Sequence, residues 1–175
     1  MIKLCVFDFD STIMDGETID ILAAANNASD EVASITKRSM NGELDFFESL
    51  TARVKFLKGM PLSKANEICK NLPIMPGASE LIAALKQKGI KVVVFSGGFH
   101  IATDKMQEKL KFDANFANIL HHKDGILTGE VGGEMMFGSS KGEMIDRLKG
   151  LLNLDKSEIM CVGDGANDVS MFRKC

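Results

Sequence analysis

Two aspartates, Asp8 and Asp10, lie one residue apart at the end of an apolar run, residues 2–7. Ligands of parallel α/β sheets bind beyond the carboxyl ends of the strands, so carboxylates at this place are well sited for chemistry. The pair therefore suggests a nucleophile. A calcium loop is excluded, because Ile13 and Ile19 stand where that loop needs a glycine and a bidentate glutamate. A structural turn is the alternative for an isolated pair.

Polar groups also follow two later apolar runs. A Ser-Gly-Gly triplet, residues 96–98, comes after one of them, and we expect it to open a helix whose N–H groups and dipole favour an anion. The acidic segment 163–168 follows the other, and Lys141 stands at the start of the helix predicted before it. Each signal is weak alone. Together the three strand ends predict one crevice with carboxylates and an anion cradle.

The elements around these residues indicate an α/β fold. Short, β-branched apolar runs without alternation are typical of strands covered on both faces by helices. Amphipathic segments separate the runs, so we expect a doubly wound, Rossmann-like and mostly parallel sheet. The predicted strands are 2–7, 90–95, 115–120 and 159–162, and the predicted helices are 76–88, 99–110 and 142–149. Within 119–131, Lys123-Asp124-Gly125 between apolar residues predicts an antiparallel hairpin.

Residues 13–72 do not follow this alternation. Four helix-favouring windows are separated by glycine, asparagine and proline, which predicts an all-helical insertion. The windows are 17–25, 30–40, 43–58 and 63–71. We therefore divide the chain into an α/β core, 1–12 and 73–175, and a helical cap, 13–72. An insertion at this end of a sheet can close over a ligand as a lid.

Composition limits the class of protein. The 175 residues are 45% apolar and 26% charged, with a net charge of −3, which suits one globular domain with an insertion. The dispersed Lys and Arg residues argue against nucleic-acid binding. No segment is long enough to cross a membrane and no cationic leader precedes the first strand, so we expect a cytoplasmic protein. The oligomeric state is not predicted. We assign no metal and no disulfide to Cys5, Cys69, Cys161 and Cys175, which lack C-x-x-C spacing.

The motifs together resemble the haloacid dehalogenase (HAD) superfamily of phosphatases. That family has D-x-D-x-T after its first strand, Ser or Thr after the second, then Lys, then G-D-x-x-N-D. Here these positions hold Asp8, Asp10, Thr12, Ser96, Lys141, Gly163, Asp164, Asn167 and Asp168. The closer wording, including Glu17-Thr18-Ile19-Asp20 and Phe95-Ser96-Gly97-Gly98-Phe99, resembles the phosphoserine phosphatases within it over essentially the whole chain.

The resemblance implies a Mg²⁺-dependent reaction on the small molecule O-phosphoserine. A phosphomonoester dianion resists an anionic nucleophile unless cations screen both partners. By resemblance, Asp8 is the nucleophile that forms an aspartyl-phosphate. Asp10 is implied to protonate the leaving serine oxygen and then to act as base toward water. The implied metal ligands are an Asp8 carboxylate oxygen, the Asp10 carbonyl and Asp164.

The resemblance also implies binding roles. Ser96, Gly97, Gly98 and Lys141 would hold the phosphoryl oxygens, with Asn167 near the substrate and Asp168 orienting water or Lys141. In the cap, Glu17 would face the ammonium, Arg53 the carboxylate, and Met40 and Phe46 would supply an apolar wall. A planar guanidinium matches a carboxylate bidentately. Without the resemblance, Glu17 is typical of an acid at a helix N-terminus and Arg53 of a solvated residue on a helix face. Met40 and Phe46 are then typical of the apolar core of a lid.

Other functions share these catalytic residues. A superfamily relative would transfer the phosphoryl group to another alcohol such as homoserine, or hydrolyse another small phosphomonoester. A non-enzymatic phospho-accepting module of the response-regulator kind has no use for Asp10 as an acid or for the cap, and a catalytically inactive binding module is a third alternative. The superfamily normally continues past the G-D-x-x-N-D helix into another strand and helix, and we expect a chain with these additions to be more stable.

Overall fold

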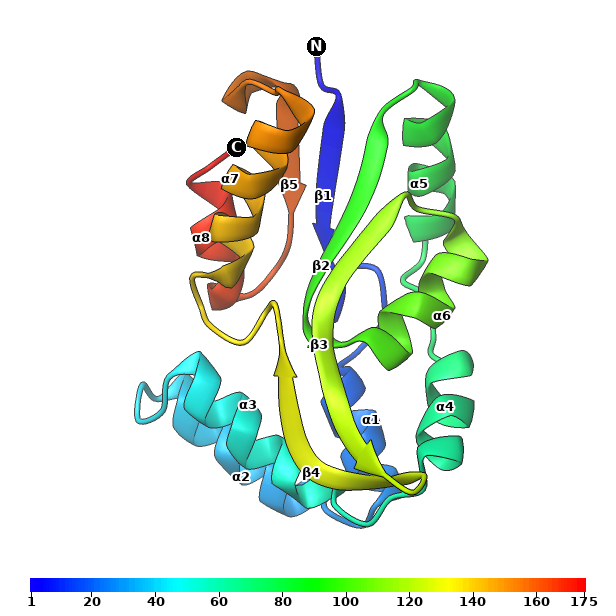
Figure 1. The fold of residues 1–175 in the computed structure, drawn as a ribbon, viewed down its shortest axis with the longest axis vertical. Coiled ribbons are helices and arrows are strands. Elements are labelled where there is room, and N and C mark those ends of the chain that lie inside the picture. The colour runs from blue at the N-terminus through cyan, green and yellow to red at the C-terminus, as the bar shows by residue number, and fades with distance from the viewer.

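The protein, seen in a computed structural model of residues 1–175, has a five-stranded sheet with the strand order β4-β3-β2-β1-β5 (Figure 1). β1 pairs in parallel with β2 and β5, β2 pairs in parallel with β3, and β4 is the one antiparallel strand. The bounds are β1 Leu4–Asp8, β2 Lys91–Phe99, β3 Ala114–Lys123, β4 Ile126–Gly133 and β5 Ile159–Val162. The predicted doubly wound, mostly parallel sheet is confirmed.

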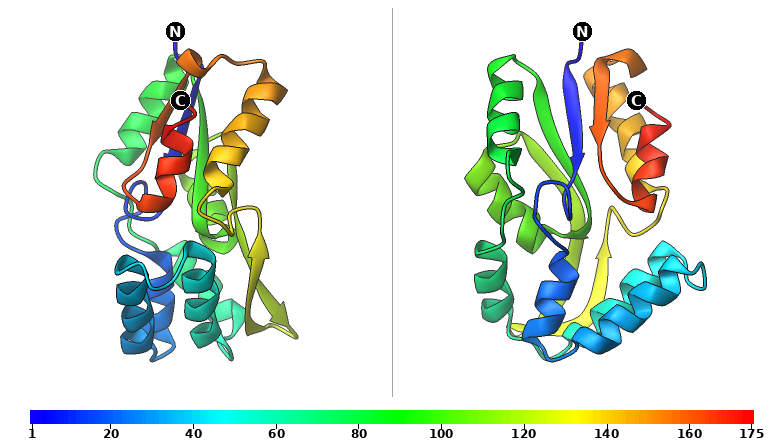
Figure 2. Two further views of the ribbon diagram at one scale, coloured as in Figure 1. Left: turned by 90° about the vertical axis from the view of Figure 1, so that its left-hand side faces the viewer. Right: turned by 180° about the vertical axis from the view of Figure 1, so that it is seen from behind.

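Helices cover both faces of the sheet, with α5 (Ala78–Gln87) and α7 (Ser140–Leu152) on opposite sides (Figure 2). Alternate residues of β1 show why. Cys5 and Phe7 belong to a hydrophobic cluster with α5 and α6 (His100–Leu110), whereas Leu4 and Val6 belong to a second cluster with α7 and α8 (Val169–Phe172). Both faces of β1 are therefore buried, which explains its continuous apolar run.

The inserted segment forms four helices beyond the carboxyl ends of the strands (Figure 1). They are α1 Thr18–Ala25, α2 Ser29–Met40, α3 Phe46–Val54 and α4 Leu62–Lys70, with a 3₁₀ turn at Lys55–Leu57. The chain enters and leaves the cap through two segments that pair with each other. Met14 bridges Ile74, and the Met75 N–H donates to the Ile13 carbonyl at 2.8 Å. No helix of this structure combines the length and apolar character needed to cross a bilayer.

β3 and β4 form the predicted hairpin, which extends from the sheet to the cap (Figure 1). Its two-residue turn, Asp124-Gly125, has φ angles of 51° and 76°, and two positive φ angles are what a type I′ turn requires. The cap binds this hairpin through its backbone, because Leu62 N–H donates to Gly125 O at 2.8 Å and Leu127 N–H donates to Met60 O at 2.9 Å. The hairpin is thus one wall of the cap.

The prediction that residues 96–98 open a helix is wrong. β2 continues to Phe99, with an irregular register between Phe95 and Phe99, and α6 begins only at His100. The neighbouring strand explains the extension. Buried Asn118 of β3 donates from its side-chain amide to the Gly97 carbonyl at 3.0 Å, which keeps the triplet within the sheet.

The expectation of no disulfide is also wrong, because Cys161 of β5 and Cys175 are bonded. The short helix α8 folds back beside β5 and brings the two Cα atoms to 6.3 Å, within the usual range for a disulfide. Sequence spacing carries no sign of that reversal. Cys5 and Cys69 are free and buried, and burial raises the pKa of each thiol to about 12.

Candidate active site

The site begins at Asp8, the last residue of β1. Lys141, in the first turn of α7, donates from Nζ to Asp8 Oδ1 and, at 2.5 Å, to Asp168 Oδ1. All three side chains are buried. Burial raises the pKa of Asp8 to about 7, although the Lys141 charge opposes this shift. Burial also acts to lower the pKa of Lys141, but the two carboxylates outweigh it and raise that pKa, so the lysine stays charged.

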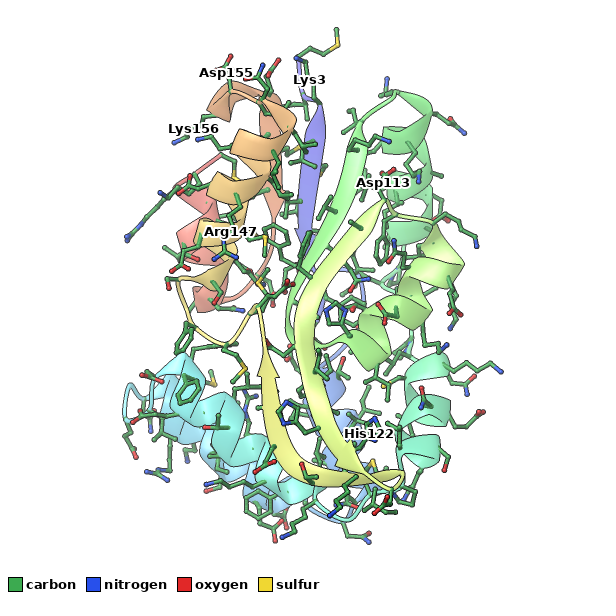
Figure 3. All side chains as sticks on the ribbon, in the orientation of Figure 1. Lys3, Asp113, His122, Arg147, Asp155 and Lys156 are labelled. Carbon is green, nitrogen blue, oxygen red and sulfur yellow. A yellow bond between two sulfur atoms is a disulfide. The ribbon has the colours of Figure 1, made fainter.

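Asp168 holds the loop that follows β5. Its second oxygen, Oδ2, accepts the backbone N–H groups of Asp164 at 3.0 Å and Gly165 at 2.9 Å. A side chain at Gly163 would collide with this carboxylate, so the loop needs a glycine there. Asp168 therefore orients both Lys141 and the loop. Lys3 and Asp113, which directly precede the amino ends of β1 and β3, lie at the opposite end of the sheet (Figure 3).

Asp10 lies just beyond β1 and is held through both oxygens. Oδ1 accepts the Thr18 N–H at 2.7 Å and the Thr18 hydroxyl at 2.5 Å, and Oδ2 accepts the Ser96 hydroxyl at 3.3 Å. Ser96 Oγ in turn accepts the Gly98 N–H at 2.9 Å. Burial raises the pKa of Asp10, although these hydrogen bonds oppose the shift. A carboxyl with a raised pKa is suited to carry a proton.

Three carboxylates lie close enough to hold a cation. One oxygen from each of Asp8, Asp164 and Asp168 lies within 4.8 Å of the others. Hard oxygen donors of this kind suit Mg²⁺ or Ca²⁺. Since both oxygens of Asp168 are already engaged by Lys141 and two N–H groups, Asp8 and Asp164 are the side chains free to bind a metal. The donor set therefore fits a divalent cation.

A cavity of about 420 Å³ separates the cap from the strand ends. It brings together the predicted residues from both parts of the chain, while Ser96, Lys141 and Asp168 lie buried outside its lining. The lining residues are Asp8, Asp10, Glu17, Ile19, Asp20, Thr36, Met40, Phe46, Leu50, Arg53, Gly97, Gly98, Asp164, Gly165 and Asn167.

One acid and one base from the cap line this cavity. Glu17 accepts the Ser11 hydroxyl at 2.7 Å. Partial desolvation by the cavity walls raises the pKa of Glu17 to about 7, and the nearby Asp10 charge adds to the shift. Arg53 donates from Nε to the Ser49 carbonyl of its own helix at 3.3 Å. Desolvation lowers the pKa of Arg53, and the surrounding carboxylates oppose that shift.

The two predicted apolar residues differ in their placement. Phe46 lies directly over β2, since a Cβ on Gly97 would be 2.5 Å from the Phe46 Cζ. Only a glycine permits this approach. Met40, at the end of α2, is 84% exposed, so it contributes only a small part of the cavity wall.

Sequence reasoning assigned no role to several residues at the site, and three of them are polar. Thr18 holds Asp10, and Asp20 and Thr36 line the cavity. Asp20 follows Glu17 by three positions at the start of a predicted helix, a spacing that places both acids on one face. Thr36 carries no comparable signal, because it is an ordinary position within an amphipathic helix.

Similar proteins of known name cover nearly the whole chain. A phosphoserine phosphatase of Campylobacter jejuni subsp. doylei is 59% identical over 174 residues, which are 99% of this chain and 84% of the relative. A phosphoserine phosphatase of Wolinella succinogenes is 64% identical over 170 residues, 97% of this chain and 82% of the relative.

Solved structures agree with these relatives. A phospho-aspartyl intermediate analogue of phosphoserine phosphatase superposes with a TM-score of 0.93 at 45% identity, covering 99% of this chain and 83% of that one. A substrate-bound phosphoserine phosphatase complex gives a TM-score of 0.94 at 44% identity, covering 100% and 83%. The family model of haloacid dehalogenase-like hydrolases matches residues 2–175. The chain belongs to the haloacid dehalogenase-like hydrolases.

Proposed function

We propose that this protein hydrolyses O-phosphoserine to serine and phosphate, the last step of serine biosynthesis. One observation carries the proposal: the cavity that exposes Asp8 also contains Glu17 and Arg53. Free phosphoserine bears a phosphate, an ammonium and a carboxylate, and each finds a group of matching chemistry there. The named relatives, all phosphoserine phosphatases, support the same substrate.

In the proposed reaction Asp8 is the nucleophile. A bond forms between its carboxylate oxygen and phosphorus, and the bond from phosphorus to the serine oxygen breaks. Asp10 gives its proton to that departing oxygen, which its raised pKa favours. Asp10 then takes a proton from the water that attacks phosphorus, and the bond from phosphorus to the Asp8 oxygen breaks. This step releases phosphate and restores the Asp8 carboxylate and the protonated Asp10.

The other residues hold the phosphoryl group and its surroundings. We assign phosphoryl contacts to Ser96, Gly97, Gly98 and Lys141, since donors aimed at the transferring group stabilise its charge in the transition state. Asn167 lines the cavity and is assigned to the substrate, whereas Asp168 positions Lys141. A Mg²⁺ ion held by Asp8, Asp164 and the Asp10 carbonyl would screen the negative charges of the nucleophile and the phosphate.

We further propose that residues 13–72 act as a lid over the core formed by 1–12 and 73–175. The two paired connecting segments beside Met14 and Ile74 support this division. In the cap, Glu17 is assigned to the ammonium, Arg53 to the carboxylate, and Phe46 with Met40 to the apolar wall. The cytoplasmic location stays a prediction.

The decisive assay measures phosphate release from O-phosphoserine with Mg²⁺, against phosphoethanolamine, p-nitrophenyl phosphate and sugar phosphates. We expect O-phosphoserine to have the highest kcat/KM. Adding homoserine tests phosphoryl transfer, which would appear as phosphohomoserine formed in place of free phosphate. Higher activity on a phosphomonoester without an amino-acid group would contradict the proposed substrate.

Removal of divalent metal is expected to stop phosphate release, and graded addition of Mg²⁺ should restore it. Ca²⁺ is expected to inhibit, because it accepts more oxygen ligands and can engage both oxygens of Asp8, which leaves no free nucleophile. Phosphate release after dialysis against EDTA and titration with each ion measures both effects. Full activity after exhaustive chelation would rule out the metal.

Activity on O-phosphoserine is expected to fall as the pH drops below about 7, more steeply than activity on p-nitrophenyl phosphate. The pKa of Glu17 is raised to about 7, so Glu17 takes up a proton there and loses its charge toward the ammonium. Profiles of kcat/KM against pH for both substrates measure the difference. Glu17→Gln should abolish the difference, and its persistence in that variant would assign the effect to another group.

A further inference from the structure

An aromatic pair joins the cap to the core next to Phe46, which lines the cavity. Phe47, in the first turn of α3, stacks on Phe137, in the segment between β4 and α7, with ring centroids 5.2 Å apart and planes 15° apart. The two rings are 38% and 57% exposed. Neither ring belongs to the buried hydrophobic clusters. Two partly exposed aromatic rings that meet across a boundary are available to hold that boundary together.

Phe137 is fixed relative to the helix that carries Lys141. Its N–H donates to the Ser140 hydroxyl at 3.1 Å, and the Ser140 N–H donates to the Phe137 carbonyl at 3.0 Å. This reciprocal pair makes a tight turn immediately before Lys141. The position of the Phe137 ring is therefore coupled to the start of α7.

Phe47 is connected to the cavity wall of the cap through its chain neighbour and its helix. Its neighbour Phe46 packs over Gly97, and its helix also carries Arg53. When the stack is formed, Phe46 covers the cavity and Arg53 lies along its wall. The Phe47–Phe137 stack thus connects the cap helix α3, which carries Arg53, with the core helix α7, which carries Lys141.

The parts of the cap differ in how firmly they are packed against the rest of the protein. α1 and α4 bury Leu22, Ala23, Ala65 and Cys69 in the main hydrophobic cluster, and Lys109 of α6 donates to the α4 carbonyl of Lys70 at 2.6 Å. α2 buries only Val32, and α3 buries Leu50 and Val54 in the same cluster, both after its first turn. Residues 33–48, which span the end of α2 and the first turn of α3 and include no buried residue, are therefore the part of the cap that can move at low cost.

We propose that the Phe47–Phe137 stack is a latch that holds the α2–α3 pair closed over the cavity, and that both phenylalanines are positioning residues for the reaction. Closure brings Phe46 and Arg53 against a substrate whose phosphate lies near Lys141. The kinetic consequence rests on the proposed function, whereas the motion of α2–α3 does not.

Hydrogen exchange of the amides in residues 29–54 tests the latch without substrate. Phe47→Ala and Phe137→Ala are each expected to speed this exchange about 2- to 10-fold, as the loss of one aromatic pair predicts. The double variant should exchange no faster than either single variant, because the stack is already lost. Phe137→Tyr keeps a ring and should exchange as the wild type does. Phe56→Ala is the matched control, since Phe56 is also 38% exposed and also in the cap but has no aromatic partner.

The kinetic arm measures O-phosphoserine hydrolysis by the same variants. We expect KM to rise about 2- to 10-fold with kcat nearly unchanged, and Phe137→Tyr to restore the wild-type value. Three results would each overturn the latch. They are unchanged exchange in residues 29–54 of the Phe47 and Phe137 variants, equally fast exchange in Phe56→Ala, and effects of the single variants that add up in the double variant. Faster exchange with an unchanged KM overturns the positioning role. If the wild-type protein does not hydrolyse O-phosphoserine, the proposed function is wrong. The exchange data would still show whether the stack holds the cap closed.

Discussion

Replacement of Asp8 by asparagine is expected to lower turnover of O-phosphoserine at least about a thousand-fold, since the amide keeps the shape of the side chain but cannot attack phosphorus. The fold should stay intact. Lys141 keeps its 2.5 Å contact with Asp168 in the variant, so no charge is left buried and unpaired. Burial raises the pKa of Asp8 to about 7, the direction expected for a charge that does not stabilise the fold.

Phosphate release and thermal unfolding, measured on the same preparation, test this expectation. Asp15→Asn is the matched control, because Asp15 is exposed on the segment that enters the cap and does not line the cavity. The control should keep both turnover and melting temperature. A folded Asp8→Asn variant with wild-type turnover would show that another residue is the nucleophile.

Loss of the Arg53 guanidinium is expected to weaken transition-state binding of O-phosphoserine by about 2–5 kcal/mol, the usual cost of removing one partner of a desolvated ionic contact. Arg53→Ala should scarcely change kcat/KM for p-nitrophenyl phosphate, which has no carboxylate. Glu17→Gln should show the same contrast, because it keeps the size of the side chain and removes its charge. Phosphoethanolamine lacks the carboxylate, so it should be a poor substrate and should lose little on Arg53→Ala.

The matched control for Arg53 is Arg38→Ala. Arg38 pairs with Glu43 at 3.0 Å on the outside of the cap and does not line the cavity. Its removal should leave all substrates unaffected. If Arg53→Ala and Glu17→Gln instead reduce activity equally on every phosphomonoester, these residues support the structure or closure of the cap, and the specificity for phosphoserine loses its basis.

The sequence predicts the core of this protein well because its chemistry lies at strand ends. Asp8 ends a run that is buried on both faces, so the apolar pattern predicts the strand and also places the carboxylate at its end. Lys141 is distant in sequence and meets Asp8 only through the packing of α7 on the sheet. Without the family resemblance, no local pattern would have paired them.

Features that depend on contacts between distant segments were not predictable. The continuation of β2 through residues 96–98 depends on the amide of Asn118, and the disulfide depends on the reversal made by α8. The stack of Phe47 on Phe137 likewise depends on how the cap sits over the core. In each case local propensity is uninformative, because the deciding partner lies on another element.

The placement of Glu17 and Arg53 in the cavity separates two kinds of phosphoserine. A residue of phosphoserine within a protein has neither a free ammonium nor a free carboxylate, since both are consumed in peptide bonds. Such a residue would leave these two side chains without the partners assigned to them. We therefore expect the protein to hydrolyse the free amino acid and to spare phosphorylated proteins, so that serine production by this route would not erase phosphorylation signals.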